Sequence, residues 1–322
     1  MPNFNGVWSL STQFQYVSDW PVPPAIAIIA GGVASGGRSN VIDFLVVSTA
    51  ANATDFGDLT TIRDGASSMS SSTRGVIAGG YNGSANDNVI QFVTFATTGN
   101  AQDFGDLSDT FAQGAAASNE TRGVYSCAFK GSNMEYPENT MEYITIASEG
   151  NSQDFGDLNR TRARSGAGSN TTRIVYAGGN YRTTLYNTID YLTIASTGNA
   201  SDFGDLVTVS SYSTGCSSST ITLIGIGTTS SNAVVNTVED FVTASTGNAT
   251  DFGDLSVAKS QVAMVSGGNT ALASGGADAS DNKLNVIEST TIASSGSFSD
   301  FGDLTVARQF ATSCSSGHGG LG

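Results

Sequence analysis

Twelve aspartates have the spacing that most invites a chemical role, because they recur in six copies of the pentapeptide Asp-Phe-Gly-Asp-Leu. The copies occupy residues 55–59, 103–107, 154–158, 202–206, 251–255 and 300–304. Carboxylates in this number suggest calcium, which takes oxygen ligands. However, the calcium-loop spacing of alternating acidic residues around a glycine, with a distal glutamate, is absent. We therefore expect no metal and no cofactor, and we expect the aspartates to cap amides beside a turn.

A catalytic set is difficult to assemble from the other residues. The single histidine, His318, lies in a glycine-rich stretch, so a site with two or three histidine ligands within one chain is excluded. A Ser–His–Asp set would have to use this same residue. Acidic residues outside the motif recur at one position, twelve residues before its first Asp, at Glu142, Asp190, Glu239 and Glu288. Recurrence in successive units indicates a structural role, whereas a carboxylate pair for glycoside hydrolysis would occur in one place only. We therefore expect no catalytic residues and no enzyme.

Four of the motif copies are followed by a cation, four residues after the motif Leu. These cations are Arg63, Arg162, Lys259 and Arg308. We expect each to form a partly exposed ion pair with the nearby aspartates, contributing about 0–1 kcal/mol.

The three cysteines, Cys127, Cys216 and Cys314, are an odd number and too few for a disulfide framework. Cys216 and Cys314 each lie ten residues after a motif Leu, at a position that holds small or apolar residues in the other copies. We expect small buried thiols.

The elements that position these residues repeat with the motif, in steps of 48, 51, 48, 49 and 49 residues. Such a period indicates a propeller, a solenoid or an array. Each unit starts with an apolar segment that ends in glycines and predicts a buried strand, as in residues 25–32, 74–80, 173–179 and 270–276. A polar loop, an alternating strand, a Gly-Asn dipeptide, the motif strand and a strand of small residues follow. The dipeptide predicts a two-residue hairpin turn.

Four strands in each of six units predict an all-β fold, a six-bladed β-propeller with four-stranded blades around a central channel. An unpartnered small-residue strand at 305–312 would complete the first blade and close the ring. The motif phenylalanines would pack between blades; they are Phe56, Phe104, Phe155, Phe203, Phe252 and Phe301. The predicted organisation is a docking segment at 1–24, the propeller at 25–314 and a glycine-rich C-terminal tail at 315–322.

Composition excludes several classes of partner. The formal net charge is −15 and only three lysines occur, so no basic face for nucleic acid or an anionic membrane can form. No basic residue precedes Arg38, so we expect no signal peptide. The longest apolar run, residues 25–34, is too short to span a bilayer.

Residues 1–24 lie outside the repeat and contain both tryptophans, Trp8 and Trp20. A disordered tail would be poor in aromatic residues. We expect these tryptophans to dock the segment, either on its own propeller or on a neighbouring subunit, and a homo-oligomer is compatible with this.

The repeat resembles kelch repeats over residues 25–314, in the strand that ends in Gly-Gly and in the aromatic one strand later, at Phe44, Phe92, Tyr143 and Tyr191. The motif phenylalanines stand in place of the kelch tryptophan. The sequences of residues 195–206 and 6–11 resemble those of kelch-type structural proteins of tailed bacteriophages, notably marine and cyanobacterial phages. This resemblance implies a component of the virion, in the tail or as a head decoration, which contacts other virion proteins.

Kelch topology would place the variable loops between second and third strands on one face with the crossings between blades. These loops carry Tyr81, Tyr136, Tyr181 and Tyr186, candidates for contact with a protein partner or a glycan. The main prediction is a non-enzymatic virion protein that presents a rigid propeller. A glycan-binding adhesin for host attachment is the alternative, and a propeller hydrolase is the third.

Overall fold

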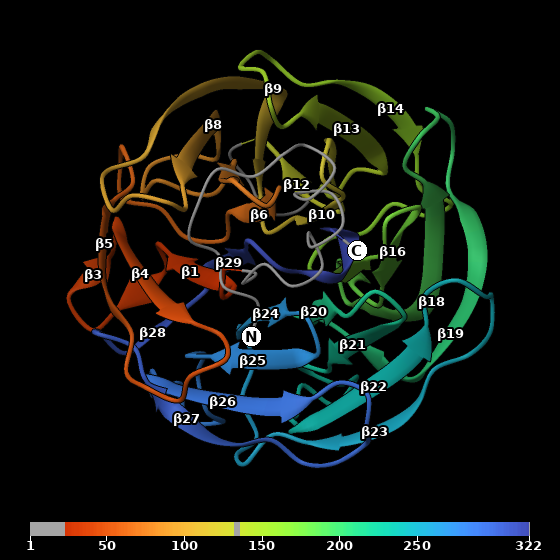
Figure 1. The fold of residues 1–322 in the computed structure, drawn as a ribbon. Coiled ribbons are helices and arrows are strands. Elements are labelled where there is room, and N and C mark those ends of the chain that lie inside the picture. The colour runs from red at the N-terminus through yellow and green to blue at the C-terminus, as the bar shows by residue number, and fades with distance from the viewer. Residues whose placement is uncertain (1–22, 132–135, 322) are drawn as a thin grey trace, which may run out of the picture.

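The computed structural model describes residues 23–131 and 136–321. These residues are all-β and form seven antiparallel sheets, with one short 3₁₀ helix, η2 (Gly319–Leu321), near the C-terminus. Six of the sheets contain four or five strands and surround a common axis, as Figure 1 shows. The prediction of an all-β chain is confirmed.

The strands of these six sheets fall into four positions, from the axis outwards. The innermost strands are β29 (Thr312–Ser315), β6 (Ser67–Ser70), β10 (Ala115–Ser118), β15 (Gly166–Ser169), β20 (Thr214–Ser217) and β24 (Ala263–Gly267). The second strands are β1 (Ile26–Ala30), β7 (Arg74–Ala78), β11 (Arg122–Ser126), β16 (Arg173–Ala177), β21 (Ile221–Gly225) and β25 (Thr270–Ser274). The third strands are β4 (Val41–Val46), β8 (Asp87–Thr94), β13 (Thr140–Thr145), β18 (Thr184–Thr193), β22 (Thr237–Val242) and β26 (Val286–Thr291). The outermost strands are β5 (Thr54–Asp58), β9 (Gln102–Ala112), β14 (Gln153–Asp157), β19 (Ser201–Ser210), β23 (Thr250–Asp254) and β27 (Ser299–Asp303).

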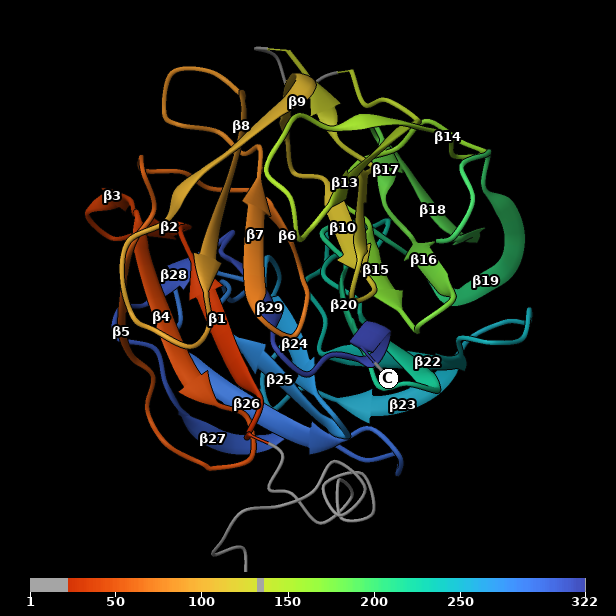
Figure 2. The same ribbon diagram turned by 45° about the horizontal axis from the view of Figure 1, so that its top comes forward.

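Short strands decorate one face of this arrangement. They are β2 (Val33–Ala34), β3 (Gly37–Arg38), β12 (Phe129–Lys130), β17 (Asn180–Tyr181) and β28 (Arg308–Gln309). Bridges join the loops after the second strands to the crossings between units, for example Tyr81 to Asp64 and Asn180 to Ala163. The predicted sharing of one face by these loops and crossings is therefore confirmed. We call this the loop face; residues 316–321 lie at the opposite face, the tail face, where Figure 2 marks the C-terminus.

The first sheet combines the two ends of the chain. Its order is β29, β1, β4 and β5, and β29 pairs antiparallel with β1 from Ala27 opposite Ser315 to Ala30 opposite Thr312. The C-terminal strand thus completes the first sheet, but it lies at 312–315 rather than at the predicted 305–312. Ser315 belongs to this strand, so the tail begins one residue later than predicted.

A row of serines joins the innermost strands to one another. Each serine stands eleven residues after a motif Leu: Ser70, Ser118, Ser169, Ser217, Ser266 and Ser315. Ser118 Oγ donates to Ser70 O at 2.8 Å, and Ser70 Oγ donates to Ser315 O at 2.8 Å. Equivalent bonds link the other neighbours, with Ser217 Oγ accepting from Ser169 N at 2.9 Å in one case. Every innermost strand is therefore bonded to the innermost strands on both sides.

The DFGDL motif forms a β-bulge in every copy. Gly57 faces Ile42 and Asp55 faces Asp43, so Phe56 is the extra residue, and the same register shift recurs in all six sheets. A bulge bends its strand and redirects a side chain. Phe56 is 3% exposed and packs among residues of two neighbouring sheets, such as Ile42 and Ile77. The other five motif phenylalanines are also buried, with at most 8% of each exposed.

The Gly-Asn dipeptide does not form the predicted two-residue hairpin turn. Strand β8 ends at Thr94 and β9 starts at Gln102, so the dipeptide lies within a longer loop. This loop docks on the motif of the preceding unit: Gly99 N donates to Phe56 O at 2.8 Å, and Asn100 Oδ1 accepts from Asp58 N at 3.0 Å. The glycine amide and the asparagine side chain therefore both join adjacent sheets. The turn propensity of the dipeptide gives no sign of this role.

This docking depends on the motif glycines, whose φ angles lie between 138° and 157°. A Cβ on Gly204 would lie 2.6 Å from Gly247 C of the docked loop. We expect Gly204→Ala to lower the free energy of unfolding by about 1–3 kcal/mol, because both the backbone conformation and the contact become strained. Urea denaturation measures the change.

Gly247→Ala is the matched control, since a Cβ there meets no atom within 4 Å. Its effect should stay within about 0.5 kcal/mol. Equal losses in the two variants would contradict this role of the motif glycine.

The prediction of partly exposed ion pairs for the four cations is wrong. Arg63, Arg162, Lys259 and Arg308 are at most 2% exposed, and their partners are not motif aspartates. Arg162 pairs with Asp190 at 3.0 Å, Lys259 with Glu288 at 2.6 Å, and Arg308 with Asp43 at 2.9 Å. Each cation lies in the crossing from one sheet to the next. Its side chain pairs with an acidic residue on the third strand of the sheet that the crossing enters.

Candidate functional site

The motif aspartates do not form a chemical centre. The first Asp of each copy is exposed on an outermost strand, and among the described residues no motif carboxylate accepts a hydrogen bond. The predicted capping role is wrong, because the amides are capped by the asparagines of docked loops instead. The described part of the chain contains no cluster of three or more His, Cys, Asp or Glu side chains suited to a metal ion.

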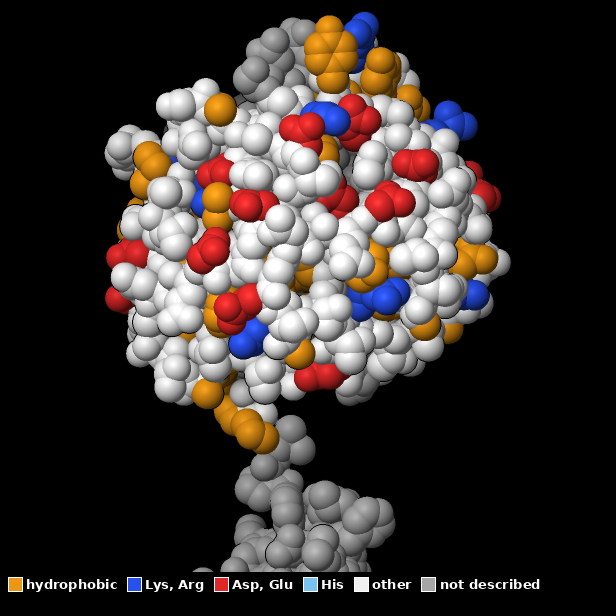
Figure 3. All heavy atoms as spheres, turned by 90° about the horizontal axis from the view of Figure 1, so that it is seen from above, with side chains coloured by type: hydrophobic (Ala, Val, Ile, Leu, Met, Phe, Trp, Pro, Cys, Tyr) orange, Lys and Arg blue, Asp and Glu red, His pale blue; other side chains and the backbone are white. Residues whose placement is uncertain are grey.

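A different physical role fits these carboxylates. The outermost strands lie at the rim of the molecule, where the docked loops bond part of each edge, and charged side chains at such edges oppose pairing with other chains. Acidic side chains are scattered singly over the side of the molecule in Figure 3, where basic side chains are fewer. The acidity of the motif therefore suits outer edges that must not pair with other chains.

The acids twelve residues before the motif also have structural partners. The residue at this position accepts a bond from the segment just after the preceding motif: Glu239 accepts Val207 N at 2.8 Å, and Gln91 accepts Thr60 N at 2.9 Å. Asp43 accepts Thr305 N at 3.2 Å in the same way. Burial raises the pKa of Glu239, and these amide bonds oppose the shift. These acids join adjacent sheets and offer no unsymmetrical pair for hydrolysis.

His318 lies inside the axial channel near the tail face. Its Nδ1 accepts from Gly320 N at 3.1 Å, so the proton resides on Nε2, which donates to Ser70 O at 3.0 Å. Ser118 Oγ is 3.3 Å from this protonated nitrogen and donates its own proton to Ser70 O. Burial lowers the pKa of His318, which favours the neutral form of the ring. A Ser–His pair for nucleophilic attack is not formed here.

The tail is part of the folded body. Gly319 and Gly320 are buried, and a Cβ on either would collide with Ser218 O or Ser118 O. The glycines of the tail therefore permit close packing against the innermost strands. The three cysteines are buried and free, as predicted, and burial raises the pKa of Cys216 and Cys314 to about 12.

The four loop tyrosines lie on the loop face but do not meet in one site. Each ring lies beside an arginine. The distance from Arg38 Cζ to the centre of the Tyr81 ring is 4.5 Å, and that from Arg160 Cζ to the centre of the Tyr186 ring is 5.6 Å. Tyr136 and Tyr181 share Arg182, at 5.8 and 5.5 Å. Tyr136 is 54% exposed and is the most accessible aromatic among them. Trp8 and Trp20, the predicted docking residues, lie outside the described residues.

A pocket that the sequence reasoning missed occupies the mouth of the channel at the loop face. Its centre is a repeated position six residues after each motif Leu, where φ lies between 54° and 61° in every unit. Glycine suits this conformation, yet five of the six positions carry other side chains: Gly65, Gln113, Arg164, Tyr212, Gln261 and Phe310. Such backbone costs about 1–3 kcal/mol per residue. The repeat therefore imposes one backbone and displays different side chains on it.

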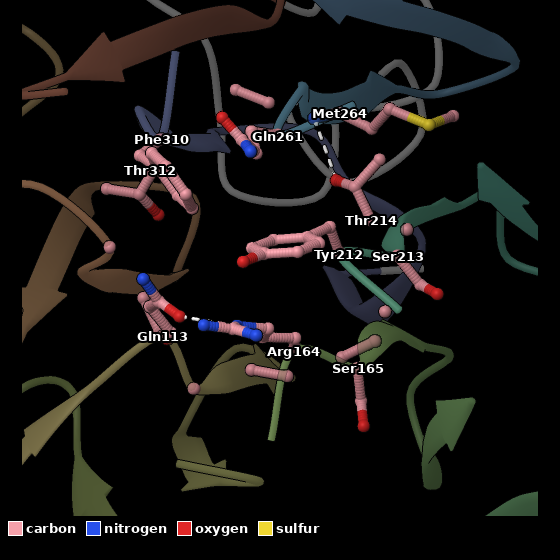
Figure 4. Close-up of a pocket in the computed structure, with 18 of the residues that line it drawn as sticks. Gln113, Arg164, Ser165, Tyr212, Ser213, Thr214, Gln261, Met264, Phe310 and Thr312 are labelled. Atoms are coloured by element: carbon pink, nitrogen blue, oxygen red, sulfur yellow. Dashed lines mark hydrogen bonds between the residues drawn. The ribbon is translucent and has the colours of Figure 1, made fainter. Parts of the chain in front are cut away.

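The displayed side chains converge on one space of about 140 Å³ (Figure 4). Arg164 Nε donates to Gln113 Oε1 at 2.6 Å, and its guanidinium lies between the rings of Tyr212, at 4.2 Å, and Phe129, at 4.9 Å. Tyr212 meets Phe310 edge to face at 5.7 Å. Gln261 Oε1 is buried without a hydrogen-bond partner among the described residues. Serine and threonine side chains of the innermost strands complete the wall.

A sequence signal for this pocket does exist. Among residues at fixed offsets from the motif, most positions hold similar side chains in every unit, whereas the sixth residue after the Leu differs in size, charge and aromaticity. A position that recurs in every unit but carries a different side chain in each can recognise an asymmetric ligand.

Comparisons with known proteins give no match, neither to a family model nor to a curated protein. In the described part of the chain, no helix is long and apolar enough to cross a membrane.

Proposed function

We propose that this chain is a six-bladed, kelch-like β-propeller and a non-enzymatic structural and interaction protein of a bacteriophage particle. The observation that carries the proposed architecture is the row of six serines, which bonds each innermost strand to both of its neighbours. The pairing of β29 with β1 supports closure of the ring by the C-terminal strand. Such a ring has no open sheet on its inner side and is rigid.

Three features support a role in binding rather than catalysis. The recurrent acids and the buried cations are engaged between sheets, His318 is a neutral donor, and the side chains that break the symmetry lie at the loop face. The virion assignment rests on the resemblance of residues 195–206 and 6–11 to phage structural proteins. In this proposal residues 1–24 contact other virion proteins and the loop face points outwards.

Quantitative mass spectrometry of gradient-purified phage particles tests the assignment. The chain should appear in the particle band at a fixed ratio to the major capsid protein, and the ratio distinguishes a head decoration in many copies from a tail part in few. Its absence from the band would refute a virion role.

A glycan-binding adhesin for host attachment is the second candidate. It is favoured by the exposed ring of Tyr136 beside Tyr181 and Arg182. Loss of glycan-array binding in a Tyr136→Ser, Tyr181→Ser variant that keeps its thermal stability would support it.

A further inference from the structure

The pocket at the channel mouth holds a cation without a counter-charge. Among the described residues, no carboxylate oxygen lies within 4.0 Å of the Arg164 guanidinium, whereas Arg63, Arg162, Lys259 and Arg308 each have an acidic partner. Arg164 is half-buried, and burial lowers its pKa. Its only hydrogen bond to the described residues uses Nε, which leaves both terminal nitrogens to a ligand. In a chain with a net charge of −15, an unpaired cation in a pocket selects an anion.

The rest of the lining is neutral and rich in hydrogen-bonding groups. Gln113 and Gln261 contribute amides, and Ser68, Ser213, Thr214 and Thr312 contribute hydroxyls. Tyr212 and Phe310, both half-buried, contribute aromatic surface. Aromatic surface with a few convergent polar groups recognises a ligand that has apolar faces and many hydroxyls. This description fits a pyranose ring, while Arg164 adds a requirement for a carboxylate.

The size and position of the pocket restrict the ligand further. A space of about 140 Å³ is close to the cavity of about 150 Å³ that holds one benzene molecule, so it accepts one six-membered ring. A second hollow lies below it and shares one lining residue from each innermost strand, but His318 and η2 narrow its tail end. A ligand must therefore enter from the loop face, and only the end of a sugar chain can reach the bottom.

We infer that the channel mouth is a binding site for a terminal acidic sugar, a carboxylate-bearing pyranose, with Arg164 pairing with the carboxylate. Tyr212 and Phe310 pack against the ring, and Gln113 and Gln261 bond its hydroxyls. This site is separate from the surface at Tyr136 and Tyr181, and the inference rests on the glycan-binding candidate only for its biological setting. Its test uses the isolated chain, so it can fail while the particle experiment succeeds, and the reverse.

Isothermal titration calorimetry of the full chain tests the site with three acidic sugars, glucuronate, galacturonate and N-acetylneuraminate, and with glucose and galactose as neutral counterparts. At least one acidic sugar should bind about tenfold or more tightly than the neutral sugars, because a charge-assisted bond to Arg164 is lost in the latter. Arg164→Gln should abolish this preference. The backbone tolerates glutamine at this position, since Gln113 and Gln261 occupy it in other units.

Lys283→Gln is the control, because Lys283 lies outside the pocket, where it pairs with Asp281, and the change should leave the preference unchanged. The inference is overturned if no acidic sugar binds, if neutral sugars bind equally well, or if Arg164→Gln keeps the preference. Binding of N-acetylaspartate as tightly as the best acidic sugar would also overturn it, and would indicate an acidic peptide as the ligand.

Discussion

Deletion of residues 312–322 is expected to leave the isolated chain unfolded, because it removes the innermost strand of the first sheet. β29 faces β1 at four positions, and Ser315 joins Ser70 on one side and Ser266 on the other. Each backbone bond lost costs about 1 kcal/mol, and exposure of an apolar side chain such as Ile28 costs about 1.5–3 kcal/mol. A loss of about 5 kcal/mol or more is comparable to the whole stability of a typical domain. Far-UV circular dichroism and thermal denaturation measure it.

A shorter deletion, of residues 317–322, separates the strand from the tail. It removes His318 and η2 but keeps β29, so we expect a folded protein with a lower melting temperature. If the longer deletion melts at the same temperature as the shorter one, β29 does not complete the first sheet in solution.

Arg308→Met is expected to lower the free energy of unfolding by about 3–5 kcal/mol, because it leaves the buried carboxylate of Asp43 without its counter-charge. The guanidinium pairs with Asp43 at 2.9 Å and also donates to Ile29 O at 2.9 Å and Val41 O at 3.0 Å. Asp43 and Arg308 are both fully buried, so water cannot replace the lost bonds. Urea denaturation at neutral pH gives the value.

Two further variants control this experiment. Lys283→Met removes an exposed pair with Asp281 and should cost less than about 1 kcal/mol. Asp43→Asn combined with Arg308→Met should cost less than the sum of the two single changes, because the double variant has no unpaired charge. A cost for Arg308→Met as small as that of Lys283→Met would mean that the buried pair is not present in solution.

The repeat itself made much of the fold predictable. Six copies of one motif and a buried apolar segment in each unit predicted the four strands and their order, and the leftover strand at the C-terminus predicted its union with the start of the chain. These inferences needed only the periodicity of the chain, because a single sequence contains the repeat unit six times. Residues 305–307 were assigned to the last strand because their composition is like that of the strand residues, although they lie in a crossing.

The contacts between units were not predictable from local patterns. Arg162 and Asn100 were interpreted by the residues near them in the chain, but both act on an adjacent sheet. The αL backbone of Arg164 and Tyr212 has no signature of its own, because neither residue favours that conformation. Comparison of equivalent positions across the units, rather than of neighbours along the chain, would have indicated both the serine row and the pocket.

Closure of the ring by the C-terminal strand is the central claim, and a disulfide across the junction between β29 and β1 tests it most directly. Ile28 faces the native Cys314 in this junction, and Leu223 faces the native Cys216 in the same geometry within the single hairpin of β20 and β21. Facing Cα atoms in an antiparallel pair lie about 4.5–5.5 Å apart, within the range for a disulfide. Ile28→Cys and Leu223→Cys therefore form a matched pair of variants. The two native thiols also match, because burial raises the pKa of both Cys216 and Cys314 to about 12. Leu272→Cys, which faces Val265, is the negative control.

The measurement is peptide mapping by mass spectrometry after oxidation of the folded variants. A closed ring predicts a disulfide between residues 28 and 314 to the same extent as the one between 223 and 216, with none for Leu272→Cys. If the hairpin variant forms its disulfide while residues 28 and 314 stay reduced, the ends of the chain do not meet and the closed propeller is contradicted.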